Sequence, residues 1–358
     1  MGKSPSYDGS GLVNLVAEIE TRLTGGSVAT GLTGAELVPD GETYVLVLFD
    51  GLGVAQLEHH GARSFANALA DVLDAPFPST TSVSLATIAS GFAPSQHGQV
   101  AHLTWMPDVG EVVNCLKWVT LGGQPVSYDY PSVLPSPNLW ERLRANGVEP
   151  ITVQPGDFSG SPLSRVLYRG ARFEPAWDAE ELVTATVQLA AEPGRFIFTY
   201  VPYVDFAGHV WGLGSDEFTE AMGLAVSVWE RIAAVLPSNA VLLGTADHGL
   251  KEFGDEQKLL VRDPRFDGMR FAGDSRGVHV WGETAAVDDL ADATGGTLVN
   301  PLSLLGAEPS AAAVERSAPQ LLLAPADLAV LPKGFDKRLR CYHGGLTPEE
   351  LQIPLLVG

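Results

Sequence analysis

Three apolar runs in the sequence end close to residues that can bind a metal ion or move a proton. The runs are TYVLVLF, RFIFTYV and AVLLG, and Asp or His follows each of them within a few positions. A further piece near the C-terminus, YHGGLTPEE, adds another histidine. A mixture of carboxylates and imidazoles suits borderline divalent ions such as zinc, which takes nitrogen and oxygen ligands at about 2.0–2.2 Å. The candidate ligands are Asp50, Asp205, His209, Asp247, His248 and His343.

Each of these residues also has an ordinary structural interpretation. An Asp directly after a strand is often a helix N-cap or a turn former, which would account for Asp50. Asp205 and His209 stand four residues apart, a spacing that also fits a simple ion pair on one helix turn. Six metal-competent residues at the ends of strands are nevertheless hard to produce by chance, so the set as a whole favours a metal site.

The stretch PSTTSVSLATIASG, residues 78–91, carries seven small hydroxyl residues in fourteen and leads into an apolar run that looks helical. Such residues are typical helix caps and turn formers. One of them could instead be a nucleophile, since a coordinated divalent ion lowers the pKa of a hydroxyl. The stretch alone leaves both interpretations open.

The elements that position these residues follow from the hydrophobic pattern. Continuous apolar runs at 44–49, 196–201 and 241–243, with further ones in GVEPITVQP and LQIPLLVG, are typical of buried parallel strands. Helical patterns cover roughly 61–73, 138–146, 178–191 and 216–236. Strands that alternate with helices predict an α/β fold with a doubly wound, mostly parallel sheet flanked by helices, and ligands bind beyond the carboxyl ends of such strands.

The pattern changes between residues 255 and 340, where shorter β-like pieces surround one helical segment, AAVDDLADATG. We therefore predict a smaller inserted α+β lobe over 255–340. The catalytic core would comprise residues 1–254 together with 341–358.

The composition indicates which classes of binding partner are disfavoured. The 43 acidic and 22 basic residues give a formal net charge of -21, which disfavours nucleic-acid polymers and anionic membranes. No secretory pattern or spanning apolar stretch is evident, and Cys115 and Cys341 form neither a disulfide framework nor a zinc-ribbon spacing. These features predict a cytoplasmic protein with no membrane partner, and they leave the oligomeric state open.

Taken in order, five pieces resemble the alkaline phosphatase superfamily, and most closely its nucleotide pyrophosphatase/phosphodiesterase branch. They are VLFDGLG, PSTTSVSLATIASGFAPSQHG, YVPYVDFAGHVWG, TADHGL and YHGGLTPEE. The resemblance implies an alkaline-phosphatase-like core with two divalent ions, zinc in the first place, with manganese or iron fitting similar residues. One ion would be held by Asp205, His209 and His343. The other would be held by Asp50, Asp247, His248 and the oxygen of the nucleophile.

The family places its nucleophilic hydroxyl at the fourth position of the motif that opens with proline, which is Thr81 when counted from Pro78. The resemblance therefore implies a metal-dependent phosphoric ester hydrolase that works through a phospho-threonine intermediate on a small phosphate ester. The branch usually continues with Phe-Pro-Asn, whereas this chain has Ser82, Val83 and Ser84, which weakens any inference of nucleotide binding.

Further candidates for substrate binding are Ser84, Asn114 and Lys117. The segment that contains the last two, HLTWMPDVGEVVNCLKWVT, also reads as a β-hairpin with aromatic side chains on its face.

Two other functions stay open at this point. A phosphomonoesterase or a mutase-like phosphotransferase could use the same core, and a mutase would need basic residues in the second lobe. Four arginines near the start of that lobe are candidates: Arg262, Arg265, Arg270 and Arg276. The second possibility is a binding protein that has kept the fold without catalysis.

Overall fold

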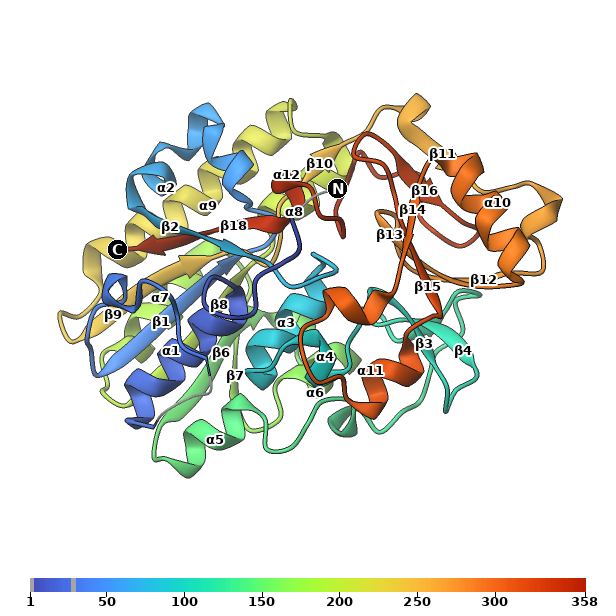
Figure 1. Ribbon diagram of the computed structural model, residues 1–358. Helices are drawn as coiled ribbons and strands as arrows, with labels where there is room; N and C mark the ends of the chain where they lie inside the picture. Colours follow the sequence, from blue (N-terminus) through green and yellow to red (C-terminus); the bar gives the residue numbers. More distant parts are fainter. Residues whose placement is uncertain (1–2, 27–29) are drawn as a thin grey trace.

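The computed structural model describes residues 3–26 and 30–358, and its larger part is built on a seven-stranded sheet (Figure 1). Five adjacent strands are parallel: β9 (Ala240–Thr245), β1 (Thr43–Phe49), β8 (Arg195–Val201), β6 (Glu149–Pro155) and β7 (Arg172–Ala176). At one edge, β18 (Gln352–Val357) runs antiparallel between β9 and β2 (Leu69–Asp74). All seven residues of β1 are buried, as expected for a central strand covered on both faces.

Helices cover both faces of this sheet (Figure 1). One group packs together as α1 (Leu12–Thr24), α3 (Thr81–Ser90) and α5 (Leu139–Ala145). The other group consists of α2 (Arg63–Ala68), α7 (Ala179–Ala190) and α9 (Asp216–Val235). The predicted α/β class with a mostly parallel, doubly wound sheet is confirmed.

One predicted helix is wrong in its second half. The pattern at 61–73 suggested a single helix, whereas α2 ends at Ala68 and β2 begins at Leu69. The reason is tertiary: residues 69–74 pair with β18 and complete the edge of the sheet. Pairing with a distant strand overrides the local helical preference.

A second seven-stranded sheet forms the smaller part of the molecule, at the right in Figure 1. In spatial order it contains β14 (Thr297–Val299), β15 (Gln320–Leu323), β13 (Gly277–Trp281), β12 (Arg270–Asp274), β3 (Leu103–Met106), β4 (Glu111–Asn114) and β5 (Val119–Thr120). The segment 103–120, which the sequence suggested could be a hairpin, thus pairs with strands from 270–323. We propose a division into a core and a smaller lobe in which this hairpin joins residues 255–340.

The remaining helices and strands lie in the connections between the strands of the two sheets. The helices are α4 (Pro94–His97), α6 (Pro162–Leu167), α8 (Tyr203–Trp211), α10 (Thr284–Thr294), α11 (Ala311–Arg316) and α12 (Pro348–Leu351). Two small two-stranded sheets pair β10 (Lys251–Glu252) with β17 (Cys341–Tyr342) and β11 (Lys258–Leu260) with β16 (Ala329–Leu331).

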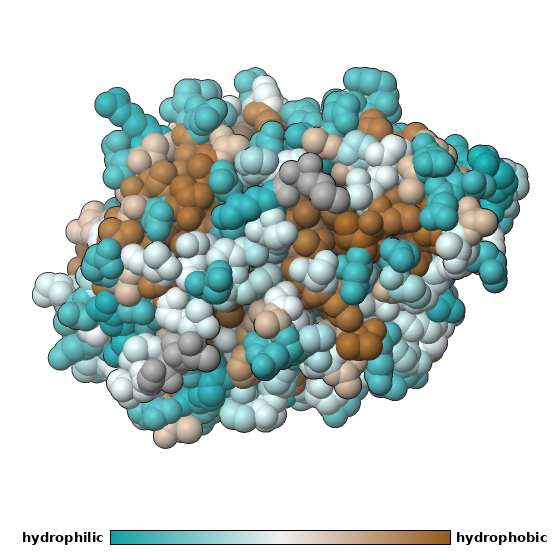
Figure 2. All heavy atoms as spheres, in the orientation of Figure 1, coloured by the Kyte–Doolittle hydropathy of each residue, from teal (hydrophilic) through white to brown (hydrophobic). Residues whose placement is uncertain are grey.

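Hydrophilic residues cover much of the outline of the face drawn in Figure 2, and an apolar area lies over the second sheet around β13 and β15. Among the described residues, no helix combines the length and apolar character required to cross a membrane.

Candidate active site

The carboxyl ends of β1, β8 and β9 bring together the acids and histidines predicted as metal ligands. The first cluster contains Asp205 and His209, one turn apart on α8, and His343, which follows β17. Asp205 and His209 are four residues apart and therefore project from the same face of the helix. Candidate ligand atoms of the three residues all lie within 4.8 Å of one another.

The second cluster contains Asp50, Asp247 and His248, which are all buried. Asp50 follows β1, and the other two follow β9. The two clusters are neighbours, because the rings of His248 and His343 stack with their centroids 3.6 Å apart. Gly51 also lets the loop after β1 lie directly against Asp205: its φ is +74°, and a Cβ there would lie 2.9 Å from Asp205 Cα.

All three clustered histidines have the same orientation. Nδ1 lies 2.8 Å from the Cys341 carbonyl in His209, 2.9 Å from the Ser79 carbonyl in His343, and 3.1 Å from the Gly249 carbonyl in His248. A carbonyl only accepts, so each Nδ1 carries a proton, and in the neutral form of each ring Nε2 keeps its lone pair. Metal-binding histidines are held in this way by a hydrogen bond on the second ring nitrogen.

The carboxylates show the complementary pattern. Asp50 Oδ2 accepts a hydrogen bond from Tyr200, and Asp247 Oδ1 accepts from the backbone N–H groups of Gly51 and His248. The opposite oxygens, Asp50 Oδ1 and Asp247 Oδ2, are buried without a hydrogen bond and lie 3.5 and 3.4 Å from His248 Nε2. Asp205 Oδ1 is likewise without a hydrogen bond, 3.2 Å from His209 Nε2.

Oxygen and nitrogen lone pairs that face one another in a buried space repel unless a proton or a metal cation lies between them. Burial, and then the charges of Asp247 and Asp205, raise the pKa of Asp50 well above its usual range. Burial and the neighbouring His248 and His209 lower the pKa of His343 well below its usual value, which keeps its imidazole neutral. The residues therefore fit two divalent cations, one in each cluster.

The hydroxyl stretch begins beside the second cluster. Thr81 is the first residue of α3, and its Oγ1 lies 3.2 Å from His248 Nε2. The first N–H groups of a helix have no partner within it, so the N-terminus of α3 offers donors and a favourable dipole to an anion at this point.

The other serines of this stretch donate their hydroxyl hydrogens to backbone carbonyls. Ser79 donates to Gly345, Ser82 to Ala101, Ser84 to Asp247 and Ser90 to Ala86. Among the threonines, Thr87 donates to Val83, and Thr80 is the N-cap residue of α3. Among the described contacts, Thr81 is the hydroxyl that faces the ligand clusters.

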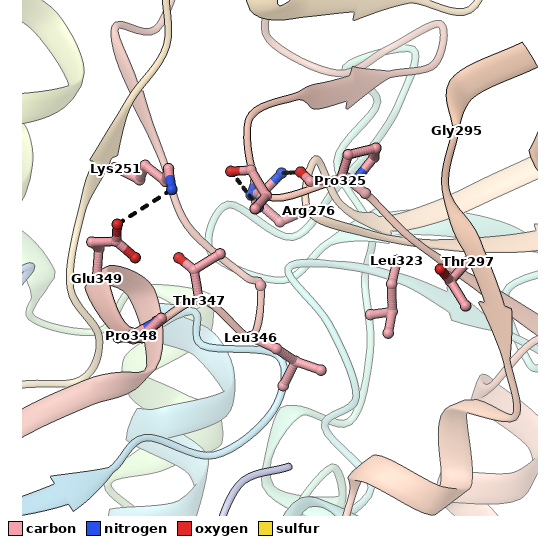
Figure 3. A pocket seen from close by; sticks show the side chains of 13 residues that line it. Lys251, Arg276, Gly295, Thr297, Leu323, Pro325, Leu346, Thr347, Pro348 and Glu349 are labelled. Atoms are coloured by element: carbon pink, nitrogen blue, oxygen red, sulfur yellow. Dashed lines mark hydrogen bonds and ion pairs between the residues drawn. The ribbon is translucent and has the colours of Figure 1, made fainter. Parts of the chain in front are cut away.

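The loop after His343 is anchored by a buried ion pair between the two lobes. Arg276 Nε lies 3.0 Å from Glu350 Oε1, and both side chains are almost fully buried. Glu350 also accepts hydrogen bonds from Gly345 N and from Thr347. Figure 3 shows Arg276 and the neighbouring pair Lys251–Glu349 around a cavity of about 460 Å³. This network fixes the turn that places His343.

The three residues predicted to bind substrate lie in different surroundings. Ser84 is fully buried, and its hydroxyl donates to the Asp247 carbonyl at 2.7 Å, so it supports the ligand loop. Asn114 contacts His102 and the following turn. Lys117 is exposed on that turn, and its charge acts on His102.

Of the four arginines predicted as a phosphosugar grip, three are engaged at separate places. Arg276 is buried against Glu350, Arg265 pairs with Asp263, and Arg270 stacks over Trp105 at 3.7 Å. Because these three side chains are engaged separately, they do not form one anion site.

Several residues near the carboxyl ends of the same strands were not predicted from the sequence. Tyr200 binds Asp50 from within β8, where it reads as an ordinary strand residue. Phe158 and Trp177 follow β6 and β7 and are exposed, Trp177 to 67%. The hydrophobic pattern and the residue spacing did not single these residues out, because their position relative to the site depends on the order of the strands in the sheet.

The profile of the family described as Type I phosphodiesterase / nucleotide pyrophosphatase matches residues 44–264. The chain belongs to this family. The match covers more than half of the sequence and includes every candidate ligand except His343. The resemblance to the nucleotide pyrophosphatase/phosphodiesterase branch of the alkaline phosphatase superfamily is thereby confirmed, and the protein is an enzyme of the phosphodiesterase/pyrophosphatase type.

Solved structures of distantly related sequences have a similar fold. Murine ectonucleotide pyrophosphatase / phosphodiesterase 5 is 17% identical, with a TM-score of 0.66 over 87% of each chain. An inactive form of that protein, in complex with AMP, is 16% identical with a TM-score of 0.66 over 87% of each chain. Phosphonoacetate hydrolase from Sinorhizobium meliloti 1021, in complex with phosphonoacetate, is 16% identical with a TM-score of 0.66 over 89% of this chain and 91% of that chain. These similarities show a shared fold. A comparison with curated proteins gave no significant match.

Proposed function

We propose that this member of the phosphodiesterase family hydrolyses small phosphate esters, diesters in the first place, with Thr81 as the nucleophile. The observation that carries the proposal is the position of its hydroxyl, which lies at the N-terminus of α3 and 3.2 Å from His248 Nε2, whereas the serines around it donate to backbone carbonyls. Thr81 Oγ1 is therefore not engaged by a backbone carbonyl and can attack phosphorus.

Asp205, His209 and His343 would hold one divalent ion, and Asp50, Asp247 and His248 together with Thr81 would hold the other. Bound divalent ions lower the pKa of a coordinated hydroxyl and offset negative charge on phosphoryl oxygens. Three imidazoles and three carboxylates favour zinc, and manganese or iron fit a similar set. The carbonyls of Cys341, Ser79 and Gly249 keep each Nε2 directed at its cluster.

The reaction proceeds in two displacements. Thr81 Oγ1 forms a bond to phosphorus, the bond to the leaving oxygen breaks, and the alcohol departs with a proton. Water then attacks the phospho-threonine, and the bond between phosphorus and Oγ1 breaks to regenerate the hydroxyl. The N–H groups at the start of α3 support the phosphoryl oxygens throughout.

The test pairs metal analysis with hydrolysis of bis-p-nitrophenyl phosphate and p-nitrophenyl phosphate. We expect about two zinc ions per chain, faster cleavage of the diester, and loss of turnover in Thr81→Ala with the metal content retained. Thr80→Val, which removes the adjacent hydroxyl, is the matched control and keeps most of the rate. Full activity of Thr81→Ala would refute the nucleophile, and a preference for the monoester would shift the function to a phosphatase.

We also propose a cytoplasmic location. Both cysteines are buried and free, which suits a reducing compartment. Fractionation of cells that express the full chain tests this, and recovery outside the cytoplasm would contradict it.

A further inference from the structure

A histidine outside the two clusters, His102, is anchored close to them. Its N–H donates to Asp274, whose side chain packs against Gly344 beside His343, and the carbonyl of the preceding Ala101 accepts a hydrogen bond from Ser82. It precedes β3, and its ring is close enough to His209 and Asp205 for their charges to act on it. Burial and the charges of His209 and Lys117 lower the pKa of His102 to about 4, so the imidazole is neutral near pH 7. In a neutral imidazole one nitrogen donates and the other accepts, and the partner of either nitrogen decides which.

Asn114 determines which ring nitrogen of His102 carries the proton. Its Oδ1 accepts hydrogen bonds from the backbone N–H groups of Leu116 and Lys117, both at 3.1 Å, which fixes the orientation of the amide. Nδ2 is therefore the atom that faces His102, 3.1 Å from Nε2. An amide nitrogen only donates, so Nε2 accepts and the proton of His102 is on Nδ1.

The protonated nitrogen has no hydrogen-bond partner within the part of the chain that the structure describes. The side chain of His102 is partly exposed, and Nδ1 is not among the atoms sealed from solvent without a partner. The backbone of His102 is held on both sides, because its N–H donates to Asp274 at 3.2 Å and its carbonyl accepts from Cys115 at 2.9 Å. The N–H donor of His102 is thus rigidly placed and has no partner among the described contacts.

We propose that His102 donates a hydrogen bond from Nδ1 to a non-bridging oxygen of a tetrahedral phosphoryl group, and that Asn114 is the positioning residue that sets its tautomer. This inference rests on the proposed function, since it names a further contact of the same substrate. A preorganised donor of this kind contributes about 100-fold or more to a rate when it is aimed at developing negative charge.

The first measurement is ¹⁵N NMR of histidine-labelled, metal-free protein, which needs no activity. We expect His102 to carry its proton on Nδ1. Asn114→Asp keeps an oxygen for the N–H groups of Leu116 and Lys117 but presents an acceptor to the ring, so the proton moves to Nε2. A wild-type His102 protonated on Nε2 would overturn the inference.

The second measurement is the affinity of the metal-loaded protein for inorganic phosphate, by calorimetry, together with the rate on bis-p-nitrophenyl phosphate. His102→Ala should weaken phosphate binding about tenfold or more and lower kcat/KM about 100-fold, with the metal content unchanged. His102→Asn, which restores an N–H donor, should recover part of both effects. The exposed His60→Ala is the matched control.

The two proposals fail in distinguishable ways. Thr81→Ala that turns over at the wild-type rate refutes the nucleophile but leaves phosphate binding as a measure of His102. Wild-type phosphate affinity in His102→Ala refutes the contact alone. Loss of metal from His102→Ala would make this residue a ligand and would also overturn the proposal.

Discussion

Acidification from pH 8 to pH 5 should destabilise this protein through two buried histidines outside the ligand clusters. Burial, together with the charge of Arg316, lowers the pKa of His97 to about 3, and burial lowers the pKa of His279 to about 4. Hydrogen bonds also favour the neutral form of both imidazoles, because His97 Nδ1 accepts from Gln99 N–H and His279 Nδ1 accepts from Ala318 N–H. Neither nitrogen can take a proton without losing its donor.

The direction and the size of this pH effect on the unfolding free energy follow from the linkage between proton binding and folding. Below pH 6.5 the unfolded chain protonates both histidines, whereas the folded chain does not until pH 4 or 3. The stabilisation is therefore complete above pH 6.5 and is lost as the pH falls below it. The 1.5 pH units from pH 6.5 to pH 5, at about 1.4 kcal/mol per unit, correspond to about 2 kcal/mol of unfolding free energy for each histidine.

Guanidinium unfolding of metal-free protein at pH 8 and pH 5 measures this effect. His97→Asn and His279→Asn each keep an oxygen in place of Nδ1 and remove the titration. Each variant should lose about 2 kcal/mol less than the wild type between the two pH values, whatever its stability at pH 8. The exposed His60→Asn serves as the control and should follow the wild type.

The reasoning would be refuted by parallel pH profiles. If His97→Asn and His279→Asn lose as much free energy as the wild type, the two histidines are protonated in the folded state. That result would mean that solvent reaches both imidazoles.

Three further outcomes follow from the same contacts. Chelation of bound metal should lower Tm, because the carboxylates of both clusters then repel one another; an unchanged Tm in differential scanning fluorimetry would speak against bound cations. Glu350→Ala leaves Arg276 buried without a countercharge and should cost about 3–5 kcal/mol in chemical unfolding, and a loss below about 1 kcal/mol would show that the pair is solvated. Gly51→Ala places a Cβ against Asp205 at a φ of +74° and should reduce the metal content, so full metal occupancy in that variant would contradict the tight approach of the two loops.

The sequence predicted the fold class well where the signal was local and strong. The buried strands of the core, such as 43–49 and 195–201, are continuous apolar runs. The helices after Asn138, Asp178 and Ser215 carry clear start signals, because each of these three residues caps its helix. It failed at 69–74, where pairing with β18 decides the structure, and it gave no sign that the hairpin at 103–120 joins a sheet made mainly of later residues. Strand partners separated by more than 150 residues leave no trace in a local pattern.

The sequence by itself determined which residue types stand at the ends of the strands, and from their order it predicted the family and the six candidate ligands. Only the tertiary structure decided how these residues are used. It placed His248 against His343, directed each Nε2 inward through a backbone carbonyl, and separated Thr81 from the neighbouring hydroxyls. It also placed Asn114, which the sequence analysis proposed for substrate binding, within hydrogen-bond distance of His102. The physical reason is that hydrogen-bond partners and tautomers depend on which backbone atoms come within 3 Å, and the packing of distant segments determines those distances.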